Sequence, residues 1–154
     1  MGLISRMPKL IGVQLAACDP VTRAFDRGRA EVTPVKMLPS FSDALKNNTP
    51  YWGAQALAAA RDSGGFFISV TDREVAAMII ELGEKEGLYL EPAGAVSVAG
   101  LKKAIGEMRL QGMNQVVCTL TGHGLNARQT AIFKEKIPEP VSPDPSKVAA
   151  YLGI

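Results

Sequence analysis

The sequence has few of the residues on which disulfide, zinc and hydrolase chemistry depend. Its 154 residues include only two cysteines, Cys18 and Cys118, which lie far apart and form no CxxC pair. We expect both to be reduced thiols, because a free cysteine usually behaves as a small buried hydrophobe. His123 is the one histidine, and no cluster of cysteine or aspartate stands at metal-ligand spacing around it. These scarcities argue against a zinc site and against a catalytic triad built on Ser97 or Cys118.

A dominant charge of one sign is also lacking. The net charge is +2, and charges of both signs are scattered along the chain, so no basic stripe indicates nucleic acid or an anionic membrane as a partner. No apolar run is long enough for a signal peptide or a membrane span, and we therefore expect a cytoplasmic protein. Hydrophobic residues make up 47% of the chain, which is enough for one globular domain with its own core.

Short apolar runs alternate with helical segments along most of the chain. The clearest helix start is Thr71-Asp72-Arg73-Glu74, which has the pattern of a capping box. Strands are expected at Leu10 to Leu15, Phe66 to Val70 and Gln115 to Leu120, and helices at Val21 to Arg27, Gly53 to Asp62, Thr71 to Gly87 and Pro92 to about Leu110. Strands separated by helices predict an α/β fold: a three-layer, open, mostly parallel sheet with helices on both faces.

Prolines divide the rest of the chain. Residues 31–50 are expected to form a mostly irregular connection, with one or two helical turns at Phe41 to Lys46. Four prolines between Ile137 and Pro145 predict an extended linker, followed by a short helix from Ser146 to Leu152. We therefore divide the chain into an α/β domain at residues 1–136 and a proline-rich linker with a C-terminal helix at residues 137–154.

The most informative stretch is the third expected strand with the loop that follows it. Its apolar residues end in Thr121-Gly122-His123-Gly124, and ligands of open α/β sheets bind just beyond the carboxyl ends of the strands. A simple strand-to-loop turn would produce the same pattern. Glu91, which precedes Pro92, also has a purely structural interpretation: its negative charge would complement the positive end of the helix that follows. The pair Lys102-Lys103 is expected to lie on a solvated helix face.

Taken in order, several segments resemble the C-terminal part of threonine synthase, a pyridoxal-phosphate enzyme family of the tryptophan-synthase-β fold. These segments are Met7 to Gln14, Ser63-Gly64-Gly65, Val70 to Glu74, Glu86 to Ala93 and Leu120 to Leu125. Several of them also occur in threonine dehydratases, whereas the Thr-Gly-His-Gly-Leu phrase favours the synthase. The resemblance implies part of the large domain of a fold-type-II pyridoxal-phosphate enzyme.

The resemblance also implies a cofactor site. The hydroxyl of Thr121 would hydrogen bond to the pyridine nitrogen of pyridoxal phosphate, with Gly122 and Glu91 beside it. A neutral hydroxyl partner leaves the ring nitrogen largely unprotonated, whereas a carboxylate would hold a proton there. In the complete enzyme of this family, O-phosphohomoserine is converted to threonine and phosphate.

The sequence also departs from that family. The Schiff-base lysine and the glycine-rich phosphate loop lie upstream of the region matched, and no lysine here stands in a context resembling the Schiff-base motif. We therefore expect no catalytic residue in this chain and no activity of the isolated chain. A complementary N-terminal polypeptide, or self-association, would be its expected partner, and only the complete enzyme would be active. The stretch Pro39 to Trp52 and the residue Asn126 also differ from the family pattern. A non-catalytic α/β binding or regulatory module, and part of a dehydratase-like enzyme, are the alternative hypotheses.

Overall fold

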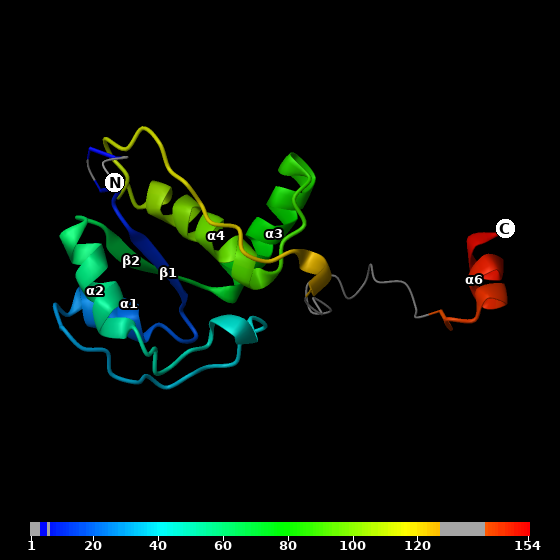
Figure 1. Cartoon of the computed structure of the whole chain (residues 1–154), viewed down its shortest axis with the longest axis horizontal. Coiled ribbons are helices and arrows are strands. Elements are labelled where there is room, and N and C mark those ends of the chain that lie inside the picture. The colour runs from blue at the N-terminus through cyan, green and yellow to red at the C-terminus, as the bar shows by residue number, and fades with distance from the viewer. Residues whose placement is uncertain (1–3, 6, 127–140) are drawn as a thin grey trace.

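The computed structural model describes residues 4, 5, 7–126 and 141–154, and it shows a parallel sheet between two pairs of helices (Figure 1). The strands β1 (Ile11–Leu15) and β2 (Phe66–Val70) pair in parallel, from Ile11 opposite Phe66 to Leu15 opposite Val70. Helices α1 (Pro20–Asp26) and α2 (Gly53–Asp62) lie on one face of the sheet. Helices α3 (Asp72–Glu86) and α4 (Pro92–Gly106) lie on the other. The expected three-layer α/β fold with a parallel sheet is therefore confirmed.

Local signals account for the bounds of α3. The Thr71 hydroxyl accepts from the backbone N–H of Glu74, and the Glu74 carboxylate accepts from the backbone N–H of Thr71, which completes the expected capping box. Gly87 ends the helix in the left-handed conformation, with φ of 67°. Val75, Met78, Ile79 and Leu82 form its buried stripe.

The core shows how α4 lies on the sheet. Near the start of α4, Ala95 and Val96 pack in one cluster with Leu15 and Val70, the last residues of the two strands. Near its end, Ala104 packs with Phe66, the first residue of β2. Helix α4 therefore runs antiparallel to both strands. A Cβ on Gly100 would lie only 2.5 Å from Cγ2 of Val13, so the glycine allows α4 to lie close to β1.

The prediction of a third strand at Gln115 to Leu120 is wrong for this structure. The segment forms no ladder with another strand, and Val117 is 94% exposed. Its composition suits a strand, but a strand needs a neighbour to satisfy its backbone N–H and C=O groups. Helix α4 also ends at Gly106, earlier than the expected limit near Leu110.

Other expectations have mixed outcomes. Asp19 stands before α1, but its side chain makes no capping hydrogen bond; instead it accepts from Arg23 and Ser69. The connection near Phe41 contains one short 3-10 helix, η1 (Asp43–Leu45).

The C-terminal helix α6 (Pro145–Leu152) is present and has no buried residue. Residues 137–140 of the proposed linker lie outside the described residues, and the division into two domains stays a prediction. Within the described part of the chain, no helix is both long and apolar enough to span a bilayer.

Candidate functional site

The segment that leads to Thr121 lies along α4 in the opposite direction. The Ser97 hydroxyl donates to the carbonyl oxygen of Thr119 at 3.0 Å. Nearer the start of α4, the backbone N–H of Glu91 donates to the carbonyl oxygen of Gly122, also at 3.0 Å. Because α4 is antiparallel to the sheet, the segment runs parallel to β1 and β2. Its last residue, Thr121, therefore lies at the carboxyl end of the sheet, where open α/β sheets bind their ligands.

A short antiparallel bridge joins the two motifs that the sequence singled out. Leu90 pairs with His123, and the backbone N–H of Gly124 donates to the carbonyl oxygen of Tyr89 at 2.8 Å. The rings of Tyr89 and His123 meet edge to face, with centroids 5.7 Å apart. The structure thus brings the residues around Glu91 and those around Gly122 into direct contact.

Two glycines allow this approach. A Cβ on Gly94 would lie 2.6 Å from the carbonyl oxygen of Gly122, closer than real Cβ atoms come to a backbone oxygen. A Cβ on Gly122 would overlap the carboxylate of Glu91, which lies over its backbone. The loop and the first turn of α4 therefore fit together only because both positions lack a side chain.

Thr121 and Glu91 differ in their surroundings. Thr121 is exposed, and its hydroxyl makes no hydrogen bond to any described residue. Glu91 is half-buried and stands at the N-cap position of α4, but its carboxylate caps no backbone N–H of the helix. The site therefore presents one neutral hydroxyl group beside a carboxylate and a helix N-terminus.

Sequence reasoning missed two residues of this site. Ser97 reaches a main-chain carbonyl 22 residues away, and nothing in its local pattern indicates that contact. Tyr89 contacts His123, which itself accepts from the backbone N–H of Leu125 at Nδ1 over 3.2 Å. The ring of His123 is therefore oriented by two neighbours, although the sequence suggested none.

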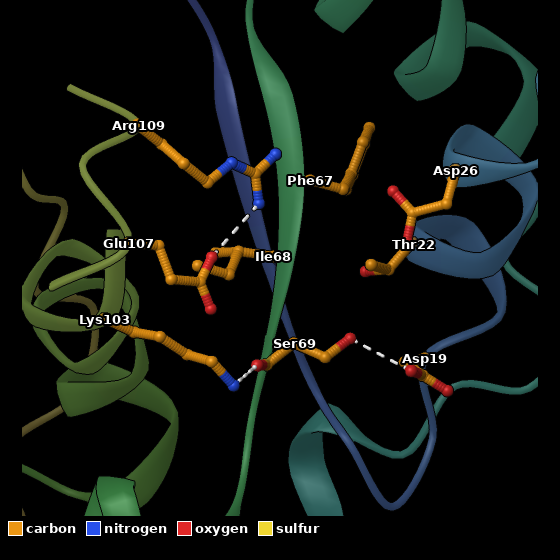
Figure 2. Close-up of a pocket in the computed structure, with 9 residues that line it drawn as sticks. All are labelled: Asp19, Thr22, Asp26, Phe67, Ile68, Ser69, Lys103, Glu107 and Arg109. Atoms are coloured by element: carbon orange, nitrogen blue, oxygen red, sulfur yellow. Dashed lines mark hydrogen bonds and ion pairs between the residues drawn. The ribbon is translucent and has the colours of Figure 1, made fainter. Parts of the chain in front are cut away.

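A polar cleft of about 270 Å³ lies elsewhere, over the outer edge of β2 (Figure 2). One wall comes from α1 and the other from the end of α4 and the residues after it. Its lining residues are Asp19, Thr22, Asp26, Phe67, Ile68, Ser69, Lys103, Glu107 and Arg109. None of the residues expected in a cofactor site, Thr121, Gly122 and Glu91, lines this cleft.

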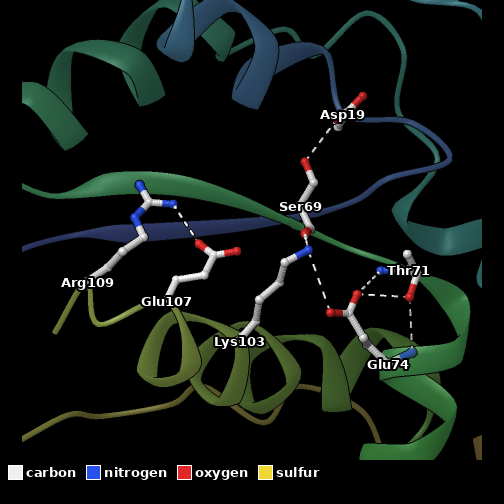
Figure 3. Close-up of polar contacts among 7 residues, drawn as sticks. All are labelled: Asp19, Ser69, Thr71, Glu74, Lys103, Glu107 and Arg109. Carbon is white, nitrogen blue, oxygen red and sulfur yellow. Dashed lines mark hydrogen bonds and ion pairs between the residues drawn. The ribbon is translucent and has the colours of Figure 1, made fainter.

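The expectation that Lys103 is solvated is wrong. Its ammonium group donates to the carbonyl oxygen of Ser69 at 2.7 Å and lies 3.6 Å from the Glu74 carboxylate (Figure 3). Its neighbour Lys102 instead pairs with Glu81 on the adjacent helix α3. The two lysines therefore face different partners, because successive residues of a helix point in different directions.

The cysteines and acidic residues offer no other reactive centre among the described residues. Both thiols are free, and burial raises the pKa of Cys118 and, together with nearby Asp19, that of Cys18. A raised pKa keeps a thiol protonated, which makes it a poor nucleophile. No three His, Cys, Asp or Glu side chains of the described residues lie together as metal ligands would.

Comparisons with known proteins show which family this chain resembles. Residues 2–122 match the family described as "Pyridoxal-phosphate dependent enzyme". Threonine synthase from Methanocaldococcus jannaschii is 35% identical over 137 residues, which are 89% of this chain and 34% of that protein. Threonine synthase from Mycobacterium bovis is 32% identical over 154 residues, all of this chain and 41% of that protein. The chain thus spans about a third to two fifths of the length of these relatives.

Solved structures share the fold. Threonine synthase from Escherichia coli aligns with a TM-score of 0.64 and 20% identity, covering 87% of this chain and 31% of that one. Threonine deaminase from T.th. aligns with a TM-score of 0.51 and 19% identity, covering 73% of this chain and 39% of that one. The fold is therefore that of part of a fold-type-II enzyme.

Proposed function

Since the chain belongs to the family of pyridoxal-phosphate dependent enzymes, we propose that it forms the C-terminal portion of a threonine-synthase-like lyase. The complete enzyme would convert O-phosphohomoserine to threonine and phosphate. The relatives named threonine synthase support this choice over a threonine deaminase, because the deaminase resembles this chain in fold alone. The lysine that holds the cofactor and the loop that binds its phosphate would come from a complementary polypeptide.

One observation carries the proposal. The bridge between Tyr89-Leu90 and His123-Gly124 holds Thr121 at the carboxyl end of the sheet, with a hydroxyl that no described residue uses. A hydroxyl can donate to the pyridine nitrogen, and the side chain of Thr121 is exposed, so its hydroxyl is accessible to a bound ring. The residues of this chain therefore fit the cofactor of the family.

The residues around Thr121 would then have distinct tasks. Thr121 would hold its proton on Oγ and donate it in a hydrogen bond, so that the ring nitrogen stays largely unprotonated. Glu91 would fix the loop through its backbone N–H, which already donates to Gly122. Ser97 would hold the approach to the loop through the carbonyl of Thr119. The cofactor, when bound, supplies an electron sink for the substrate's α-carbon.

The test is the substitution Thr121→Val in the enzyme assembled from this chain and a polypeptide that carries the lysine and the phosphate loop. Removing the hydroxyl leaves a buried acceptor unpaired, which costs about 1–3 kcal/mol. Cofactor affinity should therefore fall between about 5-fold and 150-fold. Absorbance titration with pyridoxal phosphate measures it, and Thr121→Ser, which keeps the hydroxyl, is the matched control.

A readout independent of turnover completes the test. Because Val keeps the shape of Thr, the thermal unfolding of the chain without cofactor should be the same for wild type and Thr121→Val. If Thr121→Val binds the cofactor as tightly as Thr121→Ser does, the loop is only a turn after an extended segment, and the proposed role of Thr121 is wrong.

A further inference from the structure

The floor of the polar cleft contains backbone groups that lack partners. The N–H of Phe66 donates to the carbonyl oxygen of Leu10, on the β1 side of the strand. Because the bonds of a parallel ladder join alternate residues, the N–H and C=O groups of Phe67 and Ser69 point away from β1. Among the described residues, only the Ser69 carbonyl has a partner, the Lys103 ammonium at 2.7 Å. Phe67 is only 7% exposed, and buried backbone groups are nearly always paired, so these groups need a partner beyond the described residues.

Arg109, on the wall beside α4, is held in place but makes no side-chain hydrogen bond to a described residue. Its guanidinium lies over the Phe66 ring, 3.8 Å from the ring centre. The Glu107 carboxylate is 3.7 Å away, which is beyond hydrogen-bond distance. A guanidinium carries five N–H donors in a planar fork that matches a carboxylate. Arg109 can therefore bind an anion in the cleft.

The turn that places Arg109 has an unusual conformation. Met108 has a φ of 56°, and among the described residues it is the one residue other than glycine with a positive φ. The other α-helices reach this conformation at glycines, namely Gly28, Gly64, Gly87 and Gly153. The backbone N–H of Arg109 then donates to the carbonyl oxygen of Ala104 at 2.9 Å, which returns the chain to the part of α4 that packs on Phe66. A side chain in the left-handed region costs free energy, and such strain is concentrated at functional sites.

The opposite wall, formed by α1, carries a free negative charge. The Asp26 carboxylate is exposed and has no partner among the described residues. Asp19 in the same wall is instead used by Arg23 and by the Ser69 hydroxyl. Figure 2 shows Arg109 and Asp26 on opposite sides of β2. The cleft therefore has hydrogen-bond donors without partners on one side and an acceptor without a partner on the other.

Protection of the sheet edge explains only part of this arrangement. Lysines and other charges at an edge strand prevent the addition of a further strand. Lys103 serves this purpose, because it occupies the outward carbonyl of Ser69 (Figure 3). Arg109 and Asp26 bind no backbone group of β2 through their side chains, so edge protection does not account for them.

We propose that the cleft over the edge of β2 binds a free α-amino acid. The carboxylate of the amino acid pairs with Arg109 and with outward N–H groups of the strand, and its ammonium group pairs with Asp26 and the Phe67 carbonyl. The cleft of about 270 Å³ is smaller than the sites of about 300–1,000 Å³ that take drug-sized ligands, which suits so small a molecule. The proposal does not depend on the proposed function, because no residue of the cofactor site lines the cleft.

An NMR titration of the isotope-labelled chain tests the proposal, with the standard L-amino acids as separate probes. For at least one of them, the amide signals of Phe67 and Ser69 should shift together and saturate at millimolar concentration. The amides of Ile11 and Val13, in the other strand, should not move. The amide and the N-acetyl derivative of the same amino acid lack the carboxylate charge and the ammonium group respectively, and each should bind about tenfold more weakly or worse.

Matched variants give a second measurement. Arg109→Gln and Asp26→Asn each remove one charge from a wall of the cleft and should weaken binding about tenfold or more. The controls Arg73→Gln and Asp62→Asn remove the same charges at exposed positions outside the cleft, and they should leave the affinity within about threefold. Circular dichroism checks that all four variants keep the fold.

Three results would overturn the proposal. The first is that no amino acid shifts the amides of Phe67 and Ser69. The second is that the N-acetyl derivative binds as tightly as its parent, which would assign the cleft to simple carboxylates. The third is that the cleft variants and their controls weaken binding equally, which would mean that only the net charge of the chain matters.

Discussion

At the scale of single residues, the site depends on two positions that carry no side chain. Gly94 and Gly122 bring the first turn of α4 against the loop, and Glu91 covers the backbone of Gly122. The hydroxyl of Thr121 is held by this contact, because its own side chain touches no described hydrogen-bond partner. The geometry of the proposed cofactor contact is therefore set by neighbours and not by Thr121 itself.

We expect Gly122→Ala to destabilise the fold by about 1–3 kcal/mol, the usual cost of forcing an extra methyl group into a packed site. The new Cβ would overlap the Glu91 carboxylate and push the loop away from α4. Urea unfolding measures the change. Gly106→Ala is the control, because a Cβ there meets nothing within 4 Å, and it should be neutral or slightly stabilising. Equal stability of Gly122→Ala and wild type would show that the contact between Gly122 and Glu91 has room for a methyl group.

At the scale of elements, α3 is fixed by its first turn. Burial alone would raise the pKa of Glu74, but hydrogen bonds from Thr71 and the nearby Lys103 lower it overall. A carboxyl group with a lowered pKa stabilises the folded state above its unfolded pKa, which is about 4.3. That contribution is lost as the pH falls through the lower, folded value.

The capping box therefore predicts a pH-dependent difference between variants. Between pH 5 and pH 3, wild type should lose more stability than Glu74→Gln, which has no group to titrate. At neutral pH, Thr71→Ala should lower the free energy of unfolding by about 0.5–2 kcal/mol. Urea unfolding at several pH values measures both, with the exposed Glu84→Gln as control. The same pH slope in wild type and Glu74→Gln would contradict the prediction.

The elements also show what a sequence can predict. The capping box of α3 and the strand at Phe66–Val70 follow from local patterns, since their causes lie within a few residues. The contacts of Ser97 and Lys103 do not, because their partners are backbone carbonyls 22 and 34 residues away. The strand expected at Gln115 to Leu120 is wrong for a different reason: its composition is right, but no strand of the described residues pairs with it.

At the scale of the whole molecule, Val116, Val117 and Leu120 are exposed on a segment that pairs with no strand of the described residues. Monomeric proteins rarely expose contiguous apolar surface of this kind. We expect the isolated chain to self-associate at micromolar concentration and to bind a hydrophobic dye.

Sedimentation velocity and dye fluorescence check this expectation. Val117→Lys places a charge on a side chain that is 94% exposed and should reduce self-association, whereas Arg73→Lys, on an exposed position of α3, should not. A clean monomer at high micromolar concentration, with no dye binding, would contradict the prediction.

The pairing of β1 with β2 has a consequence for the order in which the protein is made. Ile11 is paired with Phe66, so roughly 50 further residues must leave the ribosome after β1 before it meets its partner. At about 5–20 residues per second, that takes roughly 3–10 seconds of synthesis. During this time the segment at Ile11–Leu15 has both edges open, and contacts between residues so far apart in the sequence form slowly. The segment at Ile11–Leu15 is therefore most exposed to mispairing before β2 has been made.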